Sequence, residues 1–205
     1  MQRIRTALFL LILTAVWHSP SSAVTISLDP STQTVGTGSA VSVGLDISGL
    51  GDGTALSLGS FDIDILYNPL VLTFDSATFG DPGLGNQLDL FGFGTINDAG
   101  LLGSGVLNVF ELSFDLPEDL DDFQAPAFRL ATLNFTALLP GTTSLTLDVF
   151  ELGDADGLAI TDFTTEDASV TVGAPSTTVP EPSAAVLLLA GLAGIAALRK
   201  RRTQA

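Results

Sequence analysis

The feature that most constrains the fold is an alternation of apolar and polar residues with a period of two. In the run FDIDI, Phe61, Ile63 and Ile65 alternate with Asp62 and Asp64. Successive side chains of a β-strand point to opposite faces of the sheet, so this pattern predicts strands with one buried face. The same pattern marks residues 24–28, 40–47, 61–65, 71–74, 109–114, 132–137, 144–149 and 168–172.

The alternation also predicts which side chains share a face. In residues 132–137, Leu133 and Phe135 lie in phase with each other and out of phase with the polar residues. In residues 109–114, VFELSF, the same rule places Phe110, Leu112 and Phe114 together on the apolar face. The apolar face of a half-buried strand is expected to line the core.

Turn-forming segments separate these runs. GLGDG, GDPGLG and LPG combine Gly, Pro and Asp, which supply the dihedral angles that turns need. We find no stretch with the period of an amphipathic helix. About nine short strands over about 150 residues predict an all-β, antiparallel sandwich at residues 24–173.

The N-terminal segment has the layout of a secretory signal peptide. Arg3 and Arg5 precede a short apolar run, and Ser21 and Ala23 supply the small residues of a cleavage site. We therefore assign residues 1–23 to a signal peptide and expect the mature chain to begin at Val24. A buried N-terminal helix is the alternative.

The C-terminal segment reads as one short membrane span. Residues 183–198 carry no charge, and as a helix they would extend about 24 Å, somewhat less than the roughly 30 Å of a hydrocarbon core. A basic cluster follows in the tail at residues 199–205. It would stay on the cytoplasmic side and set the orientation of the span in the membrane. It consists of Arg199, Lys200, Arg201 and Arg202. Residues 174–182 form a linker rich in Pro, Ser and Thr.

Charge separates the middle of the chain from its ends. The chain has seven basic and 23 acidic residues, yet Arg129 is the only basic residue between positions 24 and 179. So acidic a domain repels nucleic acid and anionic lipid, which makes both poor partners for the exported part, and we predict no nucleic-acid partner. It would attract divalent cations or basic surfaces.

The exported part lacks most catalytic side chains. It contains no His, Cys, Lys or Trp, which excludes Ser-His-Asp and Cys-His nucleophiles and imidazole or thiolate zinc sites. Only carboxylates remain for acid–base chemistry. Asp62 and Asp64 share a strand face, and a solvated outer face explains this pair better than a hydrolase does. We therefore predict no enzymatic activity.

Two acidic segments are candidates for calcium, the only cofactor that the sequence indicates. GDADG places Asp154 and Asp156 as in part of an oxygen-ligand loop, although other ligand positions of that loop are apolar. A hairpin turn is the favoured alternative. The second segment is expected to be a solvated loop, and its acidic residues are Glu118, Asp119, Asp121 and Asp122.

The tail resembles the PEP-CTERM sorting signal of Gram-negative bacteria. A Pro-Glu-Pro motif, an apolar run and an Arg-rich end follow in that order, and the motif comprises Val179, Pro180, Glu181 and Pro182. The resemblance implies that an exosortase at the inner membrane recognises and removes the tail. It implies delivery to the cell envelope, the cell surface or an extracellular matrix. An ordinary tail anchor is the alternative.

The middle resembles cohesin domains. Tyr67-Asn68-Pro69 and the following Leu72 and Phe74 match a turn between two early strands of that family, with Asn where Asp is common. The later ELGDADGLAITDF resembles a late hairpin of the family. The resemblance implies a nine-stranded, antiparallel jelly-roll sandwich, a fold whose relatives include carbohydrate-binding domains.

These observations predict an exported, non-enzymatic binding or structural protein of the cell surface or matrix. We expect an association with exopolysaccharide or biofilm. A protein-binding module of the cohesin–dockerin type is the alternative, and a carboxylate-based hydrolase is a third hypothesis. The expected partners are an exosortase, a polysaccharide or surface protein, and the membrane through the C-terminal helix.

Overall fold

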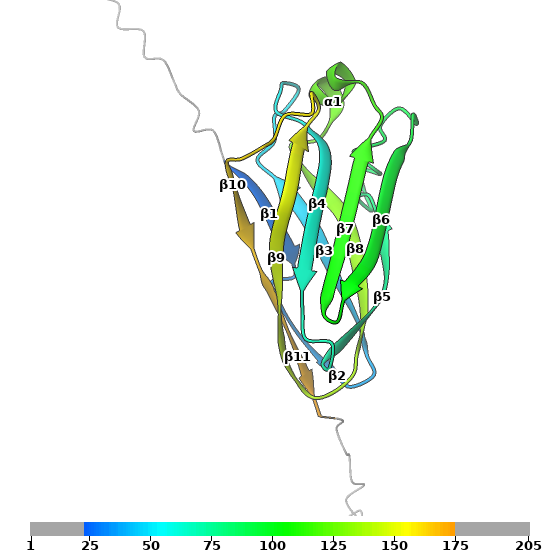
Figure 1. The fold of residues 1–205 in the computed structure, drawn as a ribbon, viewed down its shortest axis with the longest axis vertical. Coiled ribbons are helices and arrows are strands. Elements are labelled where there is room, and N and C mark those ends of the chain that lie inside the picture. Colours follow the sequence, from blue (N-terminus) through cyan, green and yellow to red (C-terminus); the bar gives the residue numbers. More distant parts are fainter. Residues whose placement is uncertain (1–22, 175–205) are drawn as a thin grey trace, which may run out of the picture.

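The computed structural model describes residues 23–174 as a two-layered β-sandwich (Figure 1). Its elements are β1 (Val24–Asp29), β2 (Thr32–Gly36), β3 (Ala40–Ser48), β4 (Leu58–Leu66), β5 (Leu72–Phe79), β6 (Thr95–Gly103), β7 (Val106–Ser113), α1 (Pro117–Phe123), β8 (Ala127–Ala137), β9 (Gly141–Asp154), β10 (Phe163–Glu166) and β11 (Ala168–Gly173). The five-stranded sheet has the order β10-β1-β3-β8-β5, and the six-stranded sheet has the order β2-β11-β9-β4-β7-β6.

The predicted all-β sandwich and all eight predicted strands are confirmed. Three further strands, β2, β6 and β10, complete the sheets. Neighbouring strands are antiparallel except for two pairs, β1 with β10 and β2 with β11, which are parallel. None of these three strands has a fully buried residue, so their side chains show no alternation between an apolar and a polar face.

Alternating side chains of both sheets form one core. In β4, Phe61, Ile63 and Ile65 are buried, as the sequence predicts, while Asp62 and Asp64 lie on the outer face. In β8, Leu133 and Phe135 are buried. The ring of Phe135 packs edge-on against Tyr67 at the predicted Tyr-Asn-Pro turn, with 5.4 Å between ring centroids. Because alternate side chains of each strand are buried in this core, the side chains between them lie on the outer face of the sheet.

One segment differs from the expected all-strand domain. The acidic segment predicted to be a loop is the short helix α1, which begins with Pro117 and buries Leu120. Proline fits the first helical turn because that turn's amide has no intrahelical partner. With seven residues, α1 is too short to show the repeating apolar pattern of an amphipathic helix.

Several predictions fall outside the described residues. These are the signal peptide with its cleavage residue Ser21, the sorting motif, the membrane span at 183–198 and the basic tail at 199–205. Within residues 23–174, no helix combines the length and the apolar character that crossing a bilayer requires. In Figure 1, β1 begins at the end of the sandwich where α1 lies, and β11 ends at the opposite end.

Candidate interaction surface

The register between strands places Phe110 on the outer face of the six-stranded sheet. Phe110 of β7 lies directly opposite Asp62 of β4 and Asp98 of β6. Directly opposite residues of antiparallel strands project from the same face. Because Asp62 is fixed outside by its buried neighbours Phe61 and Ile63, Phe110 is outside as well.

The predicted face of β7 is therefore wrong. Leu107, Val109 and Glu111 point inward and are buried, whereas Leu112 is exposed and Phe114, which follows the strand, is exposed too. The prediction failed because β7 has large apolar side chains on both faces and a carboxylate on the inner one. A rule that equates the more apolar face with the core chooses the outer face here.

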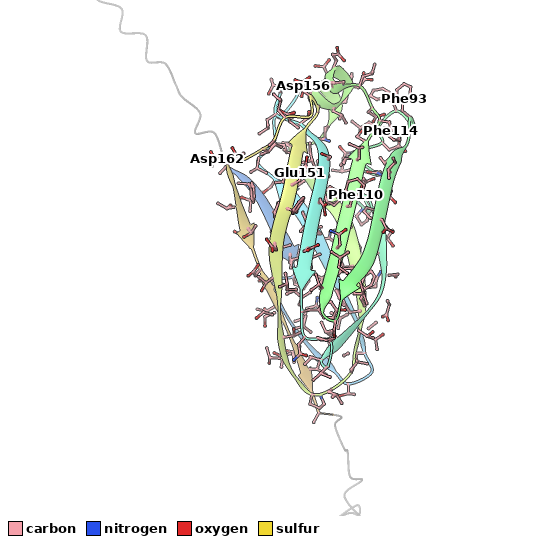
Figure 2. The ribbon with its side chains drawn as sticks, in the orientation of Figure 1. Phe93, Phe110, Phe114, Glu151, Asp156 and Asp162 are labelled. Carbon is pink, nitrogen blue, oxygen red and sulfur yellow. The ribbon has the colours of Figure 1, made fainter. Side chains whose placement is uncertain are left out.

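Large apolar side chains gather at the α1 end of this sheet, where Phe93 and Phe114 lie together in Figure 2. We call this group the apolar surface. It is contributed by β6, β7, α1 and the connection from β5 to β6. Its members and their exposed fractions are Phe91 51%, Phe93 61%, Ile96 54%, Leu112 37%, Phe114 50% and Phe123 62%. A cluster of exposed apolar side chains is a mark of an interaction site.

Local contacts hold the apolar surface in place. Phe91 packs edge-on against Phe123 of α1, with 5.5 Å between ring centroids. The Asp115 carboxylate accepts hydrogen bonds from the amides of Leu90 and Phe91, at 2.5 and 3.4 Å. Asp89 accepts another from the Gly94 amide at 2.8 Å. The apolar side chains are thus carried on an anchored connection, which lowers the entropy that binding would cost.

Acidic side chains border the apolar surface on the same sheet face. Asn108 donates hydrogen bonds to Asp62 at 2.6 Å and to Asp64 at 2.8 Å. One amide therefore bridges the two carboxylates that sequence reasoning weighed as a hydrolase pair. Glu151 of β9 lies directly opposite Asp62. The outer face thus combines an apolar end with an acidic middle (Figure 2).

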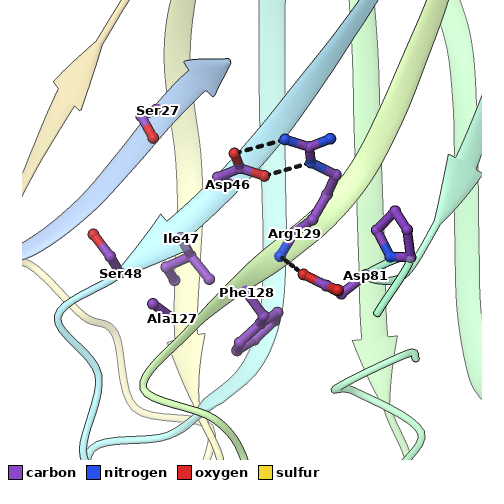
Figure 3. Close-up of a pocket in the computed structure, with 9 residues that line it drawn as sticks. Ser27, Asp46, Ile47, Ser48, Asp81, Ala127, Phe128 and Arg129 are labelled. Carbon is purple, nitrogen blue, oxygen red and sulfur yellow. Dashed lines mark hydrogen bonds and ion pairs between the residues drawn. The ribbon is translucent and has the colours of Figure 1, made fainter. Parts of the chain in front are cut away.

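The outer face of the five-stranded sheet holds Arg129, the one basic residue of the described part (Figure 3). Its Nε donates to Asp46 at 2.7 Å, and its Nη2 lies 3.3 Å from Asp29. The hydrogen bond that Arg129 donates to the Asp46 carboxylate is the largest of the causes that raise the pKa of Arg129. A shallow depression of about 450 Å³ adjoins this ion pair, and Ser27, Ser48 and Asp81 are among its lining residues.

Backbone amides stabilise the carboxylate of Asp81 beside that depression. The Arg129 amide donates to Oδ2 at 3.0 Å, and the Gly83 and Leu84 amides donate to Oδ1 at 2.7 and 2.9 Å. The Arg129 amide contributes most to lowering the pKa of Asp81 below its ordinary value. Three donors favour the charged form, so Asp81 acts here as an anchor for the turn that begins at Pro82.

The predicted calcium residues come partly together. Asp121, Asp154 and Asp156 line one pocket of about 230 Å³. However, Asp154 Oδ1 accepts a hydrogen bond from the Leu158 amide at 2.7 Å, as expected of the alternative hairpin turn. Asp121 accepts one from the Ser57 hydroxyl at 2.6 Å. Among residues 23–174, no three acidic, His or Cys side chains are grouped closely enough to hold a metal ion.

The remaining α1 carboxylates do not join this pocket's lining. Glu118 and Asp119 lie in the first turn of α1, and Asp122 follows Asp121 in its second half. Calcium at these residues stays a prediction.

The residues that sequence reasoning missed are those of the apolar surface in the β5–β6 connection. The signal was the segment LDLFGFGTI, residues 88–96, in which large apolar residues lie between glycines and outside any regular strand pattern.

Comparison with known families identifies the tail. Residues 178–202 match the PEP-CTERM protein-sorting motif. This match confirms the predicted resemblance and indicates an exported protein that an exosortase sorts. The matched range includes the Pro-Glu-Pro motif and the basic cluster. No curated protein matches the sequence.

Comparison with solved structures identifies the fold of the middle as cohesin-like. A non-cellulosomal cohesin from Archaeoglobus fulgidus aligns with a TM-score of 0.54 and 19% identity, over 76% of this chain and 94% of its own. A Clostridium acetobutylicum cohesin gives 0.56 and 19%, over 74% and 92%. A cohesin in a type I cohesin–dockerin complex from Clostridium thermocellum gives 0.57 and 12%, over 74% and 100%.

Proposed function

We propose that this chain is an exported, non-enzymatic protein-binding module that engages its partner through the apolar surface. The observation that carries the proposal is the exposure of four phenylalanines at one end of the six-stranded sheet. Fully burying an exposed phenylalanine is worth about 1.5–3 kcal/mol, and these rings are only half exposed, so covering each one contributes roughly 1 kcal/mol before the costs of association. Aromatic anchors on a pre-formed surface are typical of the centres of protein interfaces.

The acidic border gives the partner a preferred chemistry. Asp62, Asp64 and Asp98 lie on the same sheet face as Phe110, so a partner with apolar anchors and a basic rim would fit. The cohesin-like fold supports a protein partner, because a cohesin of this fold is solved in complex with a dockerin. A polysaccharide partner would have to stack on Phe, since residues 23–174 contain no Trp and one Tyr, which is buried.

The sorting tail supports an envelope location. An exosortase would process the chain near Val179–Pro182, and the cluster from Arg199 to Arg202 would fix the orientation of the precursor. Strand β11 ends at the opposite end of the sandwich from α1 and the apolar surface (Figure 1). A tether that follows residue 174 would therefore leave the apolar surface facing away from the membrane. As part of this proposal, we expect the partner to be found in an exopolysaccharide matrix or biofilm.

The binding surface can be tested by removing its anchors. In the variant Phe93→Ser/Phe114→Ser/Phe123→Ser, we expect retention of the mature chain, recovered after removal of its tail, on isolated envelopes to fall at least about tenfold, because three apolar anchors are lost. The matched control is Leu70→Ser/Leu139→Ser, which changes side chains that are 66% and 56% exposed in two other connections. Equal retention of both variants would contradict the proposal. Retention abolished by polysaccharide lyase but not by protease would assign the partner to glycan.

The sorting assignment has an independent readout. Mass spectrometry of the two ends of the protein, recovered from separated envelope fractions, should give a chain that begins at Val24 and lacks the basic cluster. In a strain without exosortase, the N-terminus should be unchanged and the basic cluster should be retained. An intact chain that begins at Met1 in the cytosol would contradict export. A hydrolytic activity that is lost in Asp62→Asn/Asp64→Asn would instead support the third hypothesis.

A further inference from the structure

Strand β6 forms one edge of the six-stranded sheet (Figure 1). Among the described strands it pairs with β7 alone, and none of its nine residues is buried. An edge strand presents unpaired backbone amide and carbonyl groups along its free side, where a strand of another chain can bind. The free side of β6 is therefore a second place where a partner could bind, besides the side chains of the apolar surface.

The other edges of the two sheets have features that hinder strand pairing. Strands β2 and β10 are short, with five and four residues. Strand β5 has a register shift between Phe74 and Ser76. By contrast, β6 keeps a regular register with β7 from Thr95 to Leu101 and contains no Pro or Lys. Because short length, bulges, Pro and Lys protect edges from pairing, β6 is the edge best suited to accept a further strand.

The register with β7 shows which backbone groups of β6 point outward. Directly before β6 begins, the Phe114 amide donates to the Gly94 carbonyl at 3.2 Å. Hydrogen-bonded and non-hydrogen-bonded pairs alternate along an antiparallel ladder, so the even-numbered residues of β6 bond to β7. The amide and carbonyl groups of Asn97, Ala99 and Leu101 therefore point away from β7, toward the open edge.

We propose that an extended segment of the partner protein binds β6 as an additional strand of this sheet. Its backbone bonds to the free groups of Asn97, Ala99 and Leu101. Strand addition deepens the proposed function and rests on it, because Ile96 of β6 belongs to the apolar surface. In this mode of recognition, backbone hydrogen bonds supply affinity and alternate side chains of the added strand supply specificity.

The outer face of β6 defines the chemistry of that segment. Asp98 lies directly opposite the outward Phe110, and Ile96, two positions away, projects from the same face. The segment therefore places a Lys or Arg opposite Asp98 and an apolar side chain opposite Ile96. A second copy of this chain does not fit, because Arg129 is the one basic residue of the described chain and is bound to Asp46 on the other sheet. The occupant is another protein, whose extended segment alternates apolar and basic residues.

The variant Ala99→Pro tests strand addition directly. Proline removes the outward amide of residue 99 and leaves in place the hydrogen bonds to β7, which the neighbouring residues make. We expect retention of the mature chain on isolated envelopes to fall at least about tenfold, because the added strand loses a backbone partner and meets the proline ring. Asp98→Lys, which changes an exposed side chain, should lower retention as well, because it repels the basic segment.

The matched control is Thr34→Pro on β2, the opposite edge of the same sheet. The Ser169 amide donates to the Ser31 carbonyl, so the odd-numbered residues of β2 bond to β11 and the Thr34 amide also points outward. This variant should be retained like the parent. Thermal unfolding of each variant identifies any that fails to fold.

Two variants together separate strand addition from the proposed function. If Ala99→Pro folds and is retained like the parent while Phe93→Ser/Phe114→Ser/Phe123→Ser is lost, strand addition is overturned and the apolar surface remains the binding site. If Ala99→Pro is lost while the phenylalanine variant is retained, strand addition is supported and the apolar surface is contradicted. An equal loss in Thr34→Pro overturns strand addition, because the effect is then not specific to β6.

A second copy as the occupant has its own readout. A dimer of the mature chain in sedimentation velocity that Ala99→Pro disrupts would overturn the assignment to another protein. If Ala99→Pro does not fold, hydrogen exchange of the parent decides. The amides of residues 95–103 should exchange more slowly in the envelope-bound mature chain than in the free one, and equal exchange overturns strand addition.

Discussion

The outer faces of the two sheets differ although both belong to one small sandwich. On the five-stranded sheet, the outward side chains of β8 include Arg129, Thr132, Asn134 and Thr136, and those of β3 include Ser42 and Asp46. On the six-stranded sheet, Phe110, Leu112 and Phe114 project outward beside Asp62 and Asp64. One face is polar throughout, while the other has an apolar end and an acidic middle.

The comparison shows that apolar side chains occur in these strands for two different reasons. On the five-stranded sheet, apolar residues in β8 serve the core, and the polar residues between them interact with solvent. On the six-stranded sheet, β7 has apolar residues on both faces, and only Leu107 and Val109 of its inner side chains are apolar and buried. The outward phenylalanines gain little from folding, as is expected if the proposed binding role accounts for their apolar character.

The largest expected effect is on stability, and it compares the two phenylalanine positions directly. Phe135→Ala removes a fully buried ring of the five-stranded sheet and should cost about 3–5 kcal/mol of unfolding free energy. Phe114→Ala removes a ring that is 50% exposed and should cost less than about 1 kcal/mol. Chemical denaturation of both variants measures the difference. Similar losses would show that Phe114 supports the fold and would remove it from the interaction surface.

The same comparison shows what the sequence could and could not predict. In β4 and β8, strict alternation identified the strand, its buried face and the outward carboxylates correctly. In β7, the pattern identified the strand but reversed its faces, because the register with β4, which a single sequence does not show, decides the direction of Phe110. Helix α1 and the exposed phenylalanines of the β5–β6 connection depend on tertiary packing, such as the contact between Phe91 and Phe123.

A smaller effect is expected for the ion pair of the polar face. A Cβ atom on Gly44 would lie 2.1 Å from the Arg129 guanidinium carbon, so glycine provides the space in which that group meets Asp46. Gly44→Ala and Arg129→Met should each cost about 1–2 kcal/mol, because each breaks a two-point, partly buried pair.

The double variant distinguishes this explanation from a general effect on the strand. Because both changes remove the same interaction, Gly44→Ala should cost little once Arg129 is Met, and the two losses should not add. The unfolding free energies of the four proteins in this cycle provide the measurement. Additive losses would mean that Gly44 is required for its backbone and not for the space beside Arg129. The six-stranded sheet has no corresponding pair among its described residues, since Arg129 is the one basic side chain of residues 23–174.

The smallest effect concerns pH and Asp81 at the edge of the polar face. Its pKa is lowered in the folded state, chiefly by the Arg129 amide, so the unfolded chain binds a proton at a higher pH than the folded chain does. The stabilisation is therefore present above the unfolded pKa of about 3.9 and is lost as the pH falls through the lower folded value. Asp81→Asn should cost less than about 1 kcal/mol at pH 7, and this cost should shrink as the pH falls through the lowered folded pKa. Denaturation between pH 7 and pH 2 measures this convergence, with Asp98→Asn on the six-stranded sheet as the control. A difference between parent and Asp81→Asn that stays constant over this range would assign the cost to the shape of the turn and not to the charge.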